Sequence, residues 1–195
     1  MKEKEILLFG ASGQIGRNLI RKLAQKNYKV TAVTRNYHQK AYILKTQANP
    51  GYLEIIEANM FDEDVLEKLI KNSDICINLI GILYEKKKNH FNLIHSDLPS
   101  LLSKVASRLS LDQFIHISAL GIEKAYDSNY ATSKLNGEKN VIQNFKKYVI
   151  LKPSIVYSVD DNFTTNFMSL LSLLPFFPLY YNGNTKFSPI HCSDL

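Results

Sequence analysis

One serine, one tyrosine and one lysine have the types and spacing that proton-transfer chemistry requires. Tyr130 and Lys134 form a Y-x-x-x-K pair, and Ser118 precedes them in the chain. On a helix, this four-residue spacing places both side chains on one face. A free tyrosine has a pKa near ~10, and a neighbouring ammonium lowers that pKa because it favours the phenolate. The three residues predict a catalytic site in which Ser118 bonds a substrate carbonyl or hydroxyl and Tyr130 transfers a proton.

Y-x-x-x-K pairs also arise by chance, and most of them are exposed residues of surface helices. The pair gains meaning only if Ser118 ends a strand and the helix of Tyr130 follows it beside a hydride-carrying cofactor. The elements that would position the three side chains therefore decide between the two interpretations.

A glycine-rich turn near the start of the sequence gives the strongest indication of such a cofactor. Residues 6–16 read ILLFGASGQIG, a short apolar run that breaks at Gly10, Gly13 and Gly16. An amphipathic helical pattern follows, so the order is strand, turn, helix. In this context the glycines permit a tight turn, close approach of a pyrophosphate, and close packing of helix on strand. The segment predicts a dinucleotide site at the helix N-terminus; the alternative is a βα turn with incidental glycines.

Short apolar runs alternate with longer amphipathic ones along the chain, which is typical of repeated βα units and a parallel sheet. Strands are predicted at residues 5–9, 29–34, 53–57, 74–80, 113–118 and 148–151. Helices are predicted at residues 14–26, 37–46, 62–71, 89–107 and 130–145, with Asp62 as an N-cap and an interruption or bend near Pro99. Right-handed crossovers then give a doubly wound Rossmann α/β fold, three αβα layers with strand order 3-2-1-4-5-6. Residues 1–195 are expected to form one such domain.

The loop after the second strand bears on the choice of dinucleotide. An acid there would bind the ribose 2′-hydroxyl, whereas an arginine would accommodate a 2′-phosphate. The loop contains Arg35 and no acid. This favours NADP(H) over NAD(H); the alternative is an ordinary surface arginine.

Two further loops at the same edge are expected to hold the adenosine. After the third strand, Asn59 is placed to bond the adenine edge and Met60 to pack on the ring. After the fourth strand, Leu79, Ile80 and Gly81 would pass beneath the ribose, where a glycine allows close approach. Both roles depend on the predicted fold.

Composition and charge exclude several classes of protein. The net charge is +6, but the lysines are scattered and the one dense run, residues 86–88, reads as a solvated loop rather than a nucleic-acid site. This charge suits a polyanionic cofactor or an anionic partner surface. Cys76 and Cys192 show no metal-ligand spacing and no disulfide framework, so a reducing, cytoplasmic compartment and no metal are expected. No secretory leader is expected, and no apolar stretch reaches the ~18 residues of a membrane helix.

The motif GASGQIG, Ser118 and the segment YATSK together resemble the short-chain dehydrogenase/reductase superfamily in its extended or atypical form. Longer blocks narrow the resemblance to one NAD-dependent epimerase/dehydratase-like branch. They are NLIGILYE (78–85), FIHISALG (114–121), SNYATSKLNGEKNV (128–141), LKPSIVYSVDDNF (151–163) and NGNTKFSPIHCSDL (182–195). This branch holds the Rossmann-fold accessory subunit of respiratory complex I and its alphaproteobacterial relatives.

The resemblance implies a role for each residue that matches these motifs. Around the pyrophosphate it places Gly10, Ser12, Gly13, Gln14 and Ile15, and at the 2′-phosphate Arg35. At the riboses it places Ile80, Gly81 and Lys134, and beside the nicotinamide Pro153, Ile155 and Val156. His95, on the helix after the fourth strand, is expected to be structural.

The resemblance also implies partners. It points to complex I subunits, and hence to a cytoplasmic protein held at the inner face of the respiratory membrane through a partner. It further implies a smaller carboxyl-terminal part that covers the substrate and lies outside these residues. The apolar segment 166–181 is expected to form a helix to Leu174 and a loop broken by Pro175 and Pro178, both packed within the chain. The alternative is an exposed surface that binds a partner or, peripherally, a membrane face.

Two main functions remain open from the sequence. The first is a binding role, in which NADPH stabilises a protein that associates with complex I or helps to assemble it. The second is an NAD(P)-dependent oxidoreductase or epimerase that uses Ser118, Tyr130 and Lys134. A cofactor-sensing regulator is a third, less favoured function.

Overall fold

The computed structural model describes residues 4–174, 180–184 and 186–195. The chain divides into two compact units, Met1–Lys152 and Pro153–Leu195. The first unit contains a six-stranded sheet and the second a two-stranded one. All six predicted strands belong to the first unit.

The large sheet is parallel, with the strand order β3-β2-β1-β4-β5-β6. Its strands are β1 (Glu5–Phe9), β2 (Lys29–Thr34), β3 (Leu53–Glu57), β4 (Ile75–Asn78), β5 (Gln113–Ile117) and β6 (Tyr148–Leu151). This confirms the doubly wound Rossmann order. Because the order reverses between β1 and β4, a crevice is expected at the carboxyl ends of these two strands.

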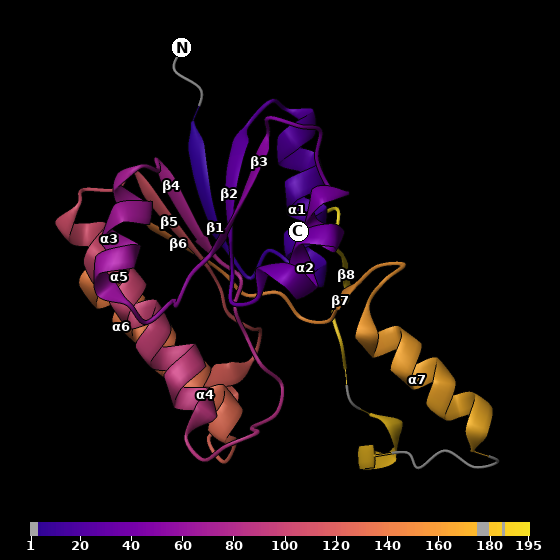
Figure 1. Cartoon of the computed structure of the whole chain (residues 1–195). Coiled ribbons are helices and arrows are strands. Elements are labelled where there is room, and N and C mark those ends of the chain that lie inside the picture. The colour runs from indigo at the N-terminus through magenta and orange to yellow at the C-terminus, as the bar shows by residue number, and fades with distance from the viewer. Residues whose placement is uncertain (1–3, 175–179, 185) are drawn as a thin grey trace. The chain divides into compact units, whose positions relative to one another are not determined.

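Helices cover both faces of this sheet (Figure 1). On one face lie α1 (Gln14–Gln25) and α2 (Tyr37–Lys45), and on the other α3 (Glu63–Lys71), α5 (Leu98–Arg108) and α6 (Asn129–Asn144). Successive residues of β1 point to opposite faces, so Leu8 joins the core under α1 with Ile20, whereas Leu7 joins the core under α5 with Leu102. The three αβα layers are therefore as predicted.

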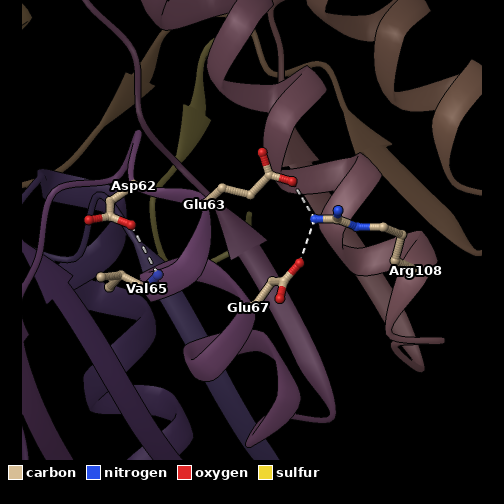
Figure 2. A network of polar contacts seen from close by, with 5 residues as sticks. All are labelled: Asp62, Glu63, Val65, Glu67 and Arg108. Carbon is tan, nitrogen blue, oxygen red and sulfur yellow. Dashed lines mark hydrogen bonds and ion pairs between the residues drawn. The ribbon is translucent and has the colours of Figure 1, made fainter.

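Side-chain caps and ion pairs fix the start of α3. The carboxylate of Asp62 accepts a hydrogen bond from the Val65 N–H (3.3 Å), so Asp62 is the N-cap, as predicted. Figure 2 shows this cap beside Arg108 of α5, which pairs with Glu63 and Glu67 of α3. Because these charges are half-exposed, the ion pairs between α3 and α5 contribute only modestly to the free energy of unfolding.

Two predicted elements near the carboxyl edge differ in detail from the structure. β4 ends at Asn78 rather than Ile80, because the Asn78 side-chain oxygen accepts from the Ile80 N–H (3.0 Å) and the chain leaves the sheet there. The helix predicted at residues 89–107, with an interruption or bend near Pro99, is confirmed as a run of helical turns from His90 to Arg108. It consists of a short helix α4 (His90–Asn92), a π-helical turn (Leu93–Asp97) and then α5. The interruption lies just before Pro99, which has no N–H to donate to the preceding turn.

The second unit contains α7 (Asn162–Leu173) and a parallel pair of strands, β7 (Val156–Tyr157) and β8 (Ile190–His191). Two 3₁₀ turns complete the described elements, η2 (Ile122–Lys124) in the first unit and η3 (Tyr180–Gly183) in the second. Asp161 caps α7 by accepting from the Thr164 N–H (2.6 Å). The helix therefore begins at Asn162, four residues before its predicted start at residue 166.

The apolar side chains of α7 are exposed. Phe167 is 42% exposed and Leu173 80%, so the expected packing of this segment within the chain is not observed for α7. Pro175 and Pro178 lie outside the described residues. Of the helices that the structure describes, none combines the length and the apolar character needed to cross a membrane.

Candidate functional site

The turn between β1 and α1 requires its glycines for different reasons. Gly10 has a φ of +81°, in the left-handed region that favours glycine. A Cβ on Gly16 would lie 2.5 Å from the carbonyl oxygens of Gly10 and Ala11, so only glycine lets α1 approach the turn this closely. A Cβ on Gly13 would meet, among the described residues, only the Gly10 oxygen at 3.3 Å. A side chain on Gly13 would therefore be crowded on one side only, by the Gly10 carbonyl.

A cavity of about 570 Å³ lies at the carboxyl ends of β1, β2 and β4. Eight of the predicted cofactor residues line it: Gly10, Ser12, Gly13, Arg35, Met60, Leu79, Ile80 and Gly81. Gly13 is the N-cap of α1 and brings no side chain to the first turn, whose N–H groups lack intrahelical partners. Together with the positive end of the helix dipole, these groups suit an anion such as a pyrophosphate.

Other predicted cofactor residues lie outside the lining of this cavity. Gln14 and Ile15 form the first turn of α1 and are half-buried. Asn59 is exposed, and its side-chain oxygen accepts from the Phe61 N–H (3.1 Å), so it stabilises its own loop. Met60, by contrast, is buried in the core and also forms part of the cavity wall.

Sequence reasoning missed two polar residues of α2 that line the same cavity, Gln39 and Lys40. The Asn36 side chain accepts from the Gln39 N–H (3.1 Å) and so starts α2 directly after Arg35. One turn of helix then brings Lys40 to the wall of the cavity that Arg35 also lines. The signal was present in the sequence as a cation five residues after Arg35 on a predicted helix.

Tyr130 and Lys134 lie on α6, as expected, whereas Ser118 follows β5, which ends at Ile117 rather than at the predicted residue 118. Lys134 is buried, and its Nζ donates to the Ile117 carbonyl oxygen (3.0 Å) at the end of β5. The next residue, Ser118, is buried, and its Oγ has no hydrogen-bond partner among the described residues. Tyr130 is the second residue of α6, lies one turn before Lys134 and is half-buried.

Burial is the largest cause of the pKa shifts of Lys134 and Tyr130. It lowers the pKa of Lys134 to about 8, an effect that the carboxylate of Glu138 partly opposes. It raises the pKa of Tyr130 above its usual value. The expectation that Lys134 would lower the pKa of the tyrosine is therefore not met in this structure. A phenolate would need a further positive charge, such as that of an oxidised nicotinamide, beside the ring.

Two buried histidines lie close enough to Lys134 for its charge to lower their pKa values. His95, in the π-helical turn, and His116, on β5, are each 1% exposed. Burial, followed by the charge of Lys134, lowers the pKa of His95 to about 4 and that of His116 to about 3. His95 Nε2 accepts from the Ile82 N–H (3.0 Å), and His116 Nδ1 lies 3.3 Å from the Asn78 side-chain nitrogen.

Pro153, Ile155 and Val156, predicted beside a nicotinamide, belong to the second unit. There Val156 starts β7, and the Ile155 carbonyl oxygen accepts from the Ile190 N–H (2.9 Å). Their place beside the cofactor stays a prediction.

Comparison with known proteins agrees with this geometry. The model of the NmrA-like family matches residues 2–172. The chain is 26% identical over 189 residues to the mitochondrial NADH-ubiquinone oxidoreductase 40 kDa subunit of Neurospora crassa, covering 96% of this chain and 49% of that protein. It is 24% identical over 189 residues to the ceramide reductase of Caulobacter vibrioides, covering 97% and 57%. The chain thus spans about half the length of the curated relatives it matches.

Among solved structures, the UDP-glucuronic acid 4-epimerase of Bacillus cereus, in complex with UDP-glucuronic acid and NAD, superposes with a TM-score of 0.75. The sequence identity is 22%, and the match covers 97% of this chain and 70% of the epimerase. At this identity the likeness shows the fold, which is that of a Rossmann protein.

Proposed function

The chain belongs to the NmrA-like family, and from this premise we propose that it binds a nicotinamide dinucleotide at the carboxyl edge of its large sheet. The observation that carries the proposal is a single cavity that extends from Gly13 at the start of α1 to Arg35 at the end of β2. The pyrophosphate would lie over Gly13, and the adenosine would lie between Arg35 and Met60. A bound dinucleotide would supply a nicotinamide that accepts or donates hydride.

The preferred dinucleotide is NADP(H). Arg35 and Lys40 bring two cations to one cavity, and none of the described residues that line it is acidic. A guanidinium binds phosphate in a bidentate geometry, and an ammonium adds a second charge. Preference for NAD(H) would instead need an acid to bind the 2′-hydroxyl.

The role that these features support best is that of an accessory or assembly protein of respiratory complex I, with NADPH as a stabilising ligand. The name of the Neurospora crassa relative supports this role. The net charge of +6 suits an anionic partner surface. In that role the protein would reach the inner face of the respiratory membrane through its partners.

A second function, an NAD(P)-dependent oxidoreductase or epimerase, is supported by one observation. The buried Ser118 Oγ has no partner in the described part of the chain, and a buried hydroxyl usually has one. A substrate oxygen would provide that partner, with Tyr130 as the proton donor or acceptor. The reductase name of the Caulobacter vibrioides relative fits the same function.

Isothermal titration with NADPH, NADH and ATP tests the binding proposal. NADPH should bind about tenfold more tightly than NADH, or better, because each charged hydrogen bond to a phosphate contributes roughly 1.5–3 kcal/mol. Equal affinities would remove the NADP(H) preference, and no binding of any of the three would overturn the dinucleotide site.

The two functions are separated by turnover and by association. Oxidation of NADPH with carbonyl substrates, lost in Tyr130→Phe while NADPH binding persists, would establish the enzyme. Tight NADPH binding without turnover, together with co-purification of respiratory subunits, would establish the accessory role.

A further inference from the structure

His95 joins two parts of the candidate site that are far apart in sequence. Its Nε2 accepts from the N–H of Ile82, a residue of the cavity lining after β4. Its Nδ1 lies 3.0 Å from the Ser133 Oγ on α6. The Ser133 hydroxyl in turn donates to the carbonyl oxygen of Tyr130 (2.8 Å). One imidazole thus connects the edge of the cavity to the turn of helix that carries Tyr130.

These partners determine the tautomer of the ring. The Ile82 N–H can only donate, so Nε2 must be the unprotonated, accepting nitrogen. The Ser133 hydroxyl donates its only hydrogen to the Tyr130 carbonyl oxygen. Its own oxygen must therefore accept a hydrogen bond from Nδ1–H of His95. Both conditions are met by the neutral Nδ1–H tautomer. An imidazolium would place a second donor against the Ile82 N–H and break the contact.

The surrounding backbone and rings hold His95 in this position. It lies in the π-helical turn Leu93–Asp97, and a Cβ on Gly137 of α6 would lie only 1.8 Å from the His95 carbonyl oxygen. Its ring stacks on Phe91 (centroids 5.4 Å apart, 19° between planes) and meets the Tyr130 ring edge-on (5.2 Å, 86°). The close helix contact and the two rings therefore surround the imidazole and support its orientation.

We propose that His95 is a positioning residue, which as the neutral Nδ1–H tautomer fastens the Ile82 edge of the cavity to the Tyr130 turn of α6. The inference rests on the proposed function, because it assigns a role within that dinucleotide site. It differs from a purely structural role in linking the cavity to the Ser-Tyr-Lys cluster.

The same link predicts which half of the dinucleotide depends on His95. A Cβ on Gly81 would lie 3.4 Å from Lys134 Nζ and 3.9 Å from His95 Nε2, so the loop after β4 packs against both groups. Leu79 and Ile80 are the part of this loop expected beneath the adenosine ribose, whereas Ile82, which bonds His95, follows them on the side of Lys134. Loss of the His95 contacts should therefore weaken a ligand that includes the nicotinamide ribose, and spare one that ends at the adenosine phosphates.

The test compares His95→Phe, which keeps a ring but removes both hydrogen bonds, with the control Asn140→Ala. Asn140 also joins α6 to the π-helical turn, through hydrogen bonds to the Ser96 carbonyl (3.2 Å) and Oγ (3.1 Å), but contacts neither Ile82 nor the Tyr130 turn in these bonds. NADPH affinity should fall about 5- to 10-fold in His95→Phe, as loss of one to two ordinary hydrogen bonds predicts. Affinity for 2′,5′-ADP should stay unchanged, and Asn140→Ala should change neither.

A second variant and a ligand-free measurement keep the test decisive if His95→Phe folds poorly. In His95→Gln the amide oxygen can reach the position of Nε2, so hydrogen exchange of the Ile82 amide should stay slow, whereas in His95→Phe it should speed up at least tenfold. In the wild-type protein the ¹⁵N spectrum of His95 should show a protonated Nδ1 and an unprotonated Nε2 at neutral pH.

Two results would overturn the proposal. One is an Nε2–H tautomer in the wild-type protein with unchanged Ile82 exchange in His95→Phe. The other is an equal loss of NADPH and 2′,5′-ADP affinity in His95→Phe, which a general loss of structure would cause. If the wild-type protein binds neither ligand, the proposed function fails, and the positioning role is then decided by the tautomer and the Ile82 exchange.

Discussion

Lys134 Nζ donates a 3.0 Å hydrogen bond to the carbonyl oxygen of Ile117, the residue that ends β5 and precedes Ser118. This bond ties α6 to the carboxyl end of β5. It also uses one of the three Nζ protons on the backbone, which leaves two for a ribose or a substrate. The relationship fixes the lysine near the serine, although no hydrogen bond joins the two side chains in the described structure.

The two cations of the cavity should decide the choice between NADPH and NADH. Arg35→Ala and Lys40→Ala should each weaken NADPH binding about tenfold or more, because each removes a charged partner of the 2′-phosphate. NADH affinity should change little, since NADH lacks that phosphate. Arg21→Ala, on the exposed face of α1, is a matched control that should leave both affinities intact. If the variants lost NADPH and NADH affinity equally, Arg35 and Lys40 would attract any anionic dinucleotide rather than bind the 2′-phosphate.

Two glycines of the same turn should separate binding from stability. Gly13→Ala adds a methyl group 3.3 Å from one carbonyl oxygen, which can shift by a few tenths of an ångström. It should change the free energy of unfolding by only about 1 kcal/mol, yet abolish dinucleotide binding. Gly16→Ala drives a Cβ to 2.5 Å from two carbonyl oxygens and should cost roughly 1–3 kcal/mol or more. Urea denaturation and NADPH titration of both variants measure the two effects. A Gly13→Ala protein that still binds NADPH would place the pyrophosphate elsewhere.

The elements predicted correctly are those with local causes. Asp62 caps α3 through a residue three positions away, and the apolar run before Gly10 forms β1. An interruption near Pro99 was predicted, but the π-helical form of the turn at Leu93–Asp97 was not. There the backbone at His95 packs against Gly137, which lies forty-two positions later in the chain. No periodicity within residues 89–107 contains that contact.

The same distinction between local and tertiary causes decides which residues of the candidate site could be predicted. Gly10, Gly13 and Arg35 were found because their positions follow from the strand ends. Lys40 was missed because its approach to the cavity depends on where the Asn36 cap starts α2. The raised pKa of Tyr130 could not be anticipated either, since it depends on how deeply the ring is buried rather than on its spacing from a lysine.

Glu138 should control the protonation of Lys134. Its Oε2 pairs with Lys152 Nζ at 2.7 Å, its Oε1 has no hydrogen-bond partner in the described chain, and its charge raises the pKa of Lys134. Glu138→Gln removes that charge with little change in shape, so the pKa of Lys134 should fall below about 8. NMR titration of the lysine side chain measures the shift. Glu67→Gln, on the exposed α3–α5 ion pair, should not move it.

The two buried histidines should make the protein less stable in mild acid. The pKa of a histidine in the unfolded chain is about 6.5, whereas folding lowers it to about 4 for His95 and about 3 for His116. Between pH 6.5 and pH 4 the unfolded state therefore binds protons that the native state does not bind. Stability should be fully present above pH 6.5 and should fall as the pH decreases below it.

The expected size follows from the same shifts. At pH 5, each histidine should lower the free energy of unfolding by about 2 kcal/mol relative to pH 7, since one pH unit corresponds to roughly 1.4 kcal/mol. Urea denaturation at pH 7, 6 and 5 measures this slope. Replacement of His95 by Gln removes one of the two groups, so the variant should lose about half of the slope between pH 6 and pH 5. An unchanged slope in His95→Gln would mean that His95 accepts a proton in the folded protein, which the hydrogen bond from the Ile82 N–H to Nε2 does not allow.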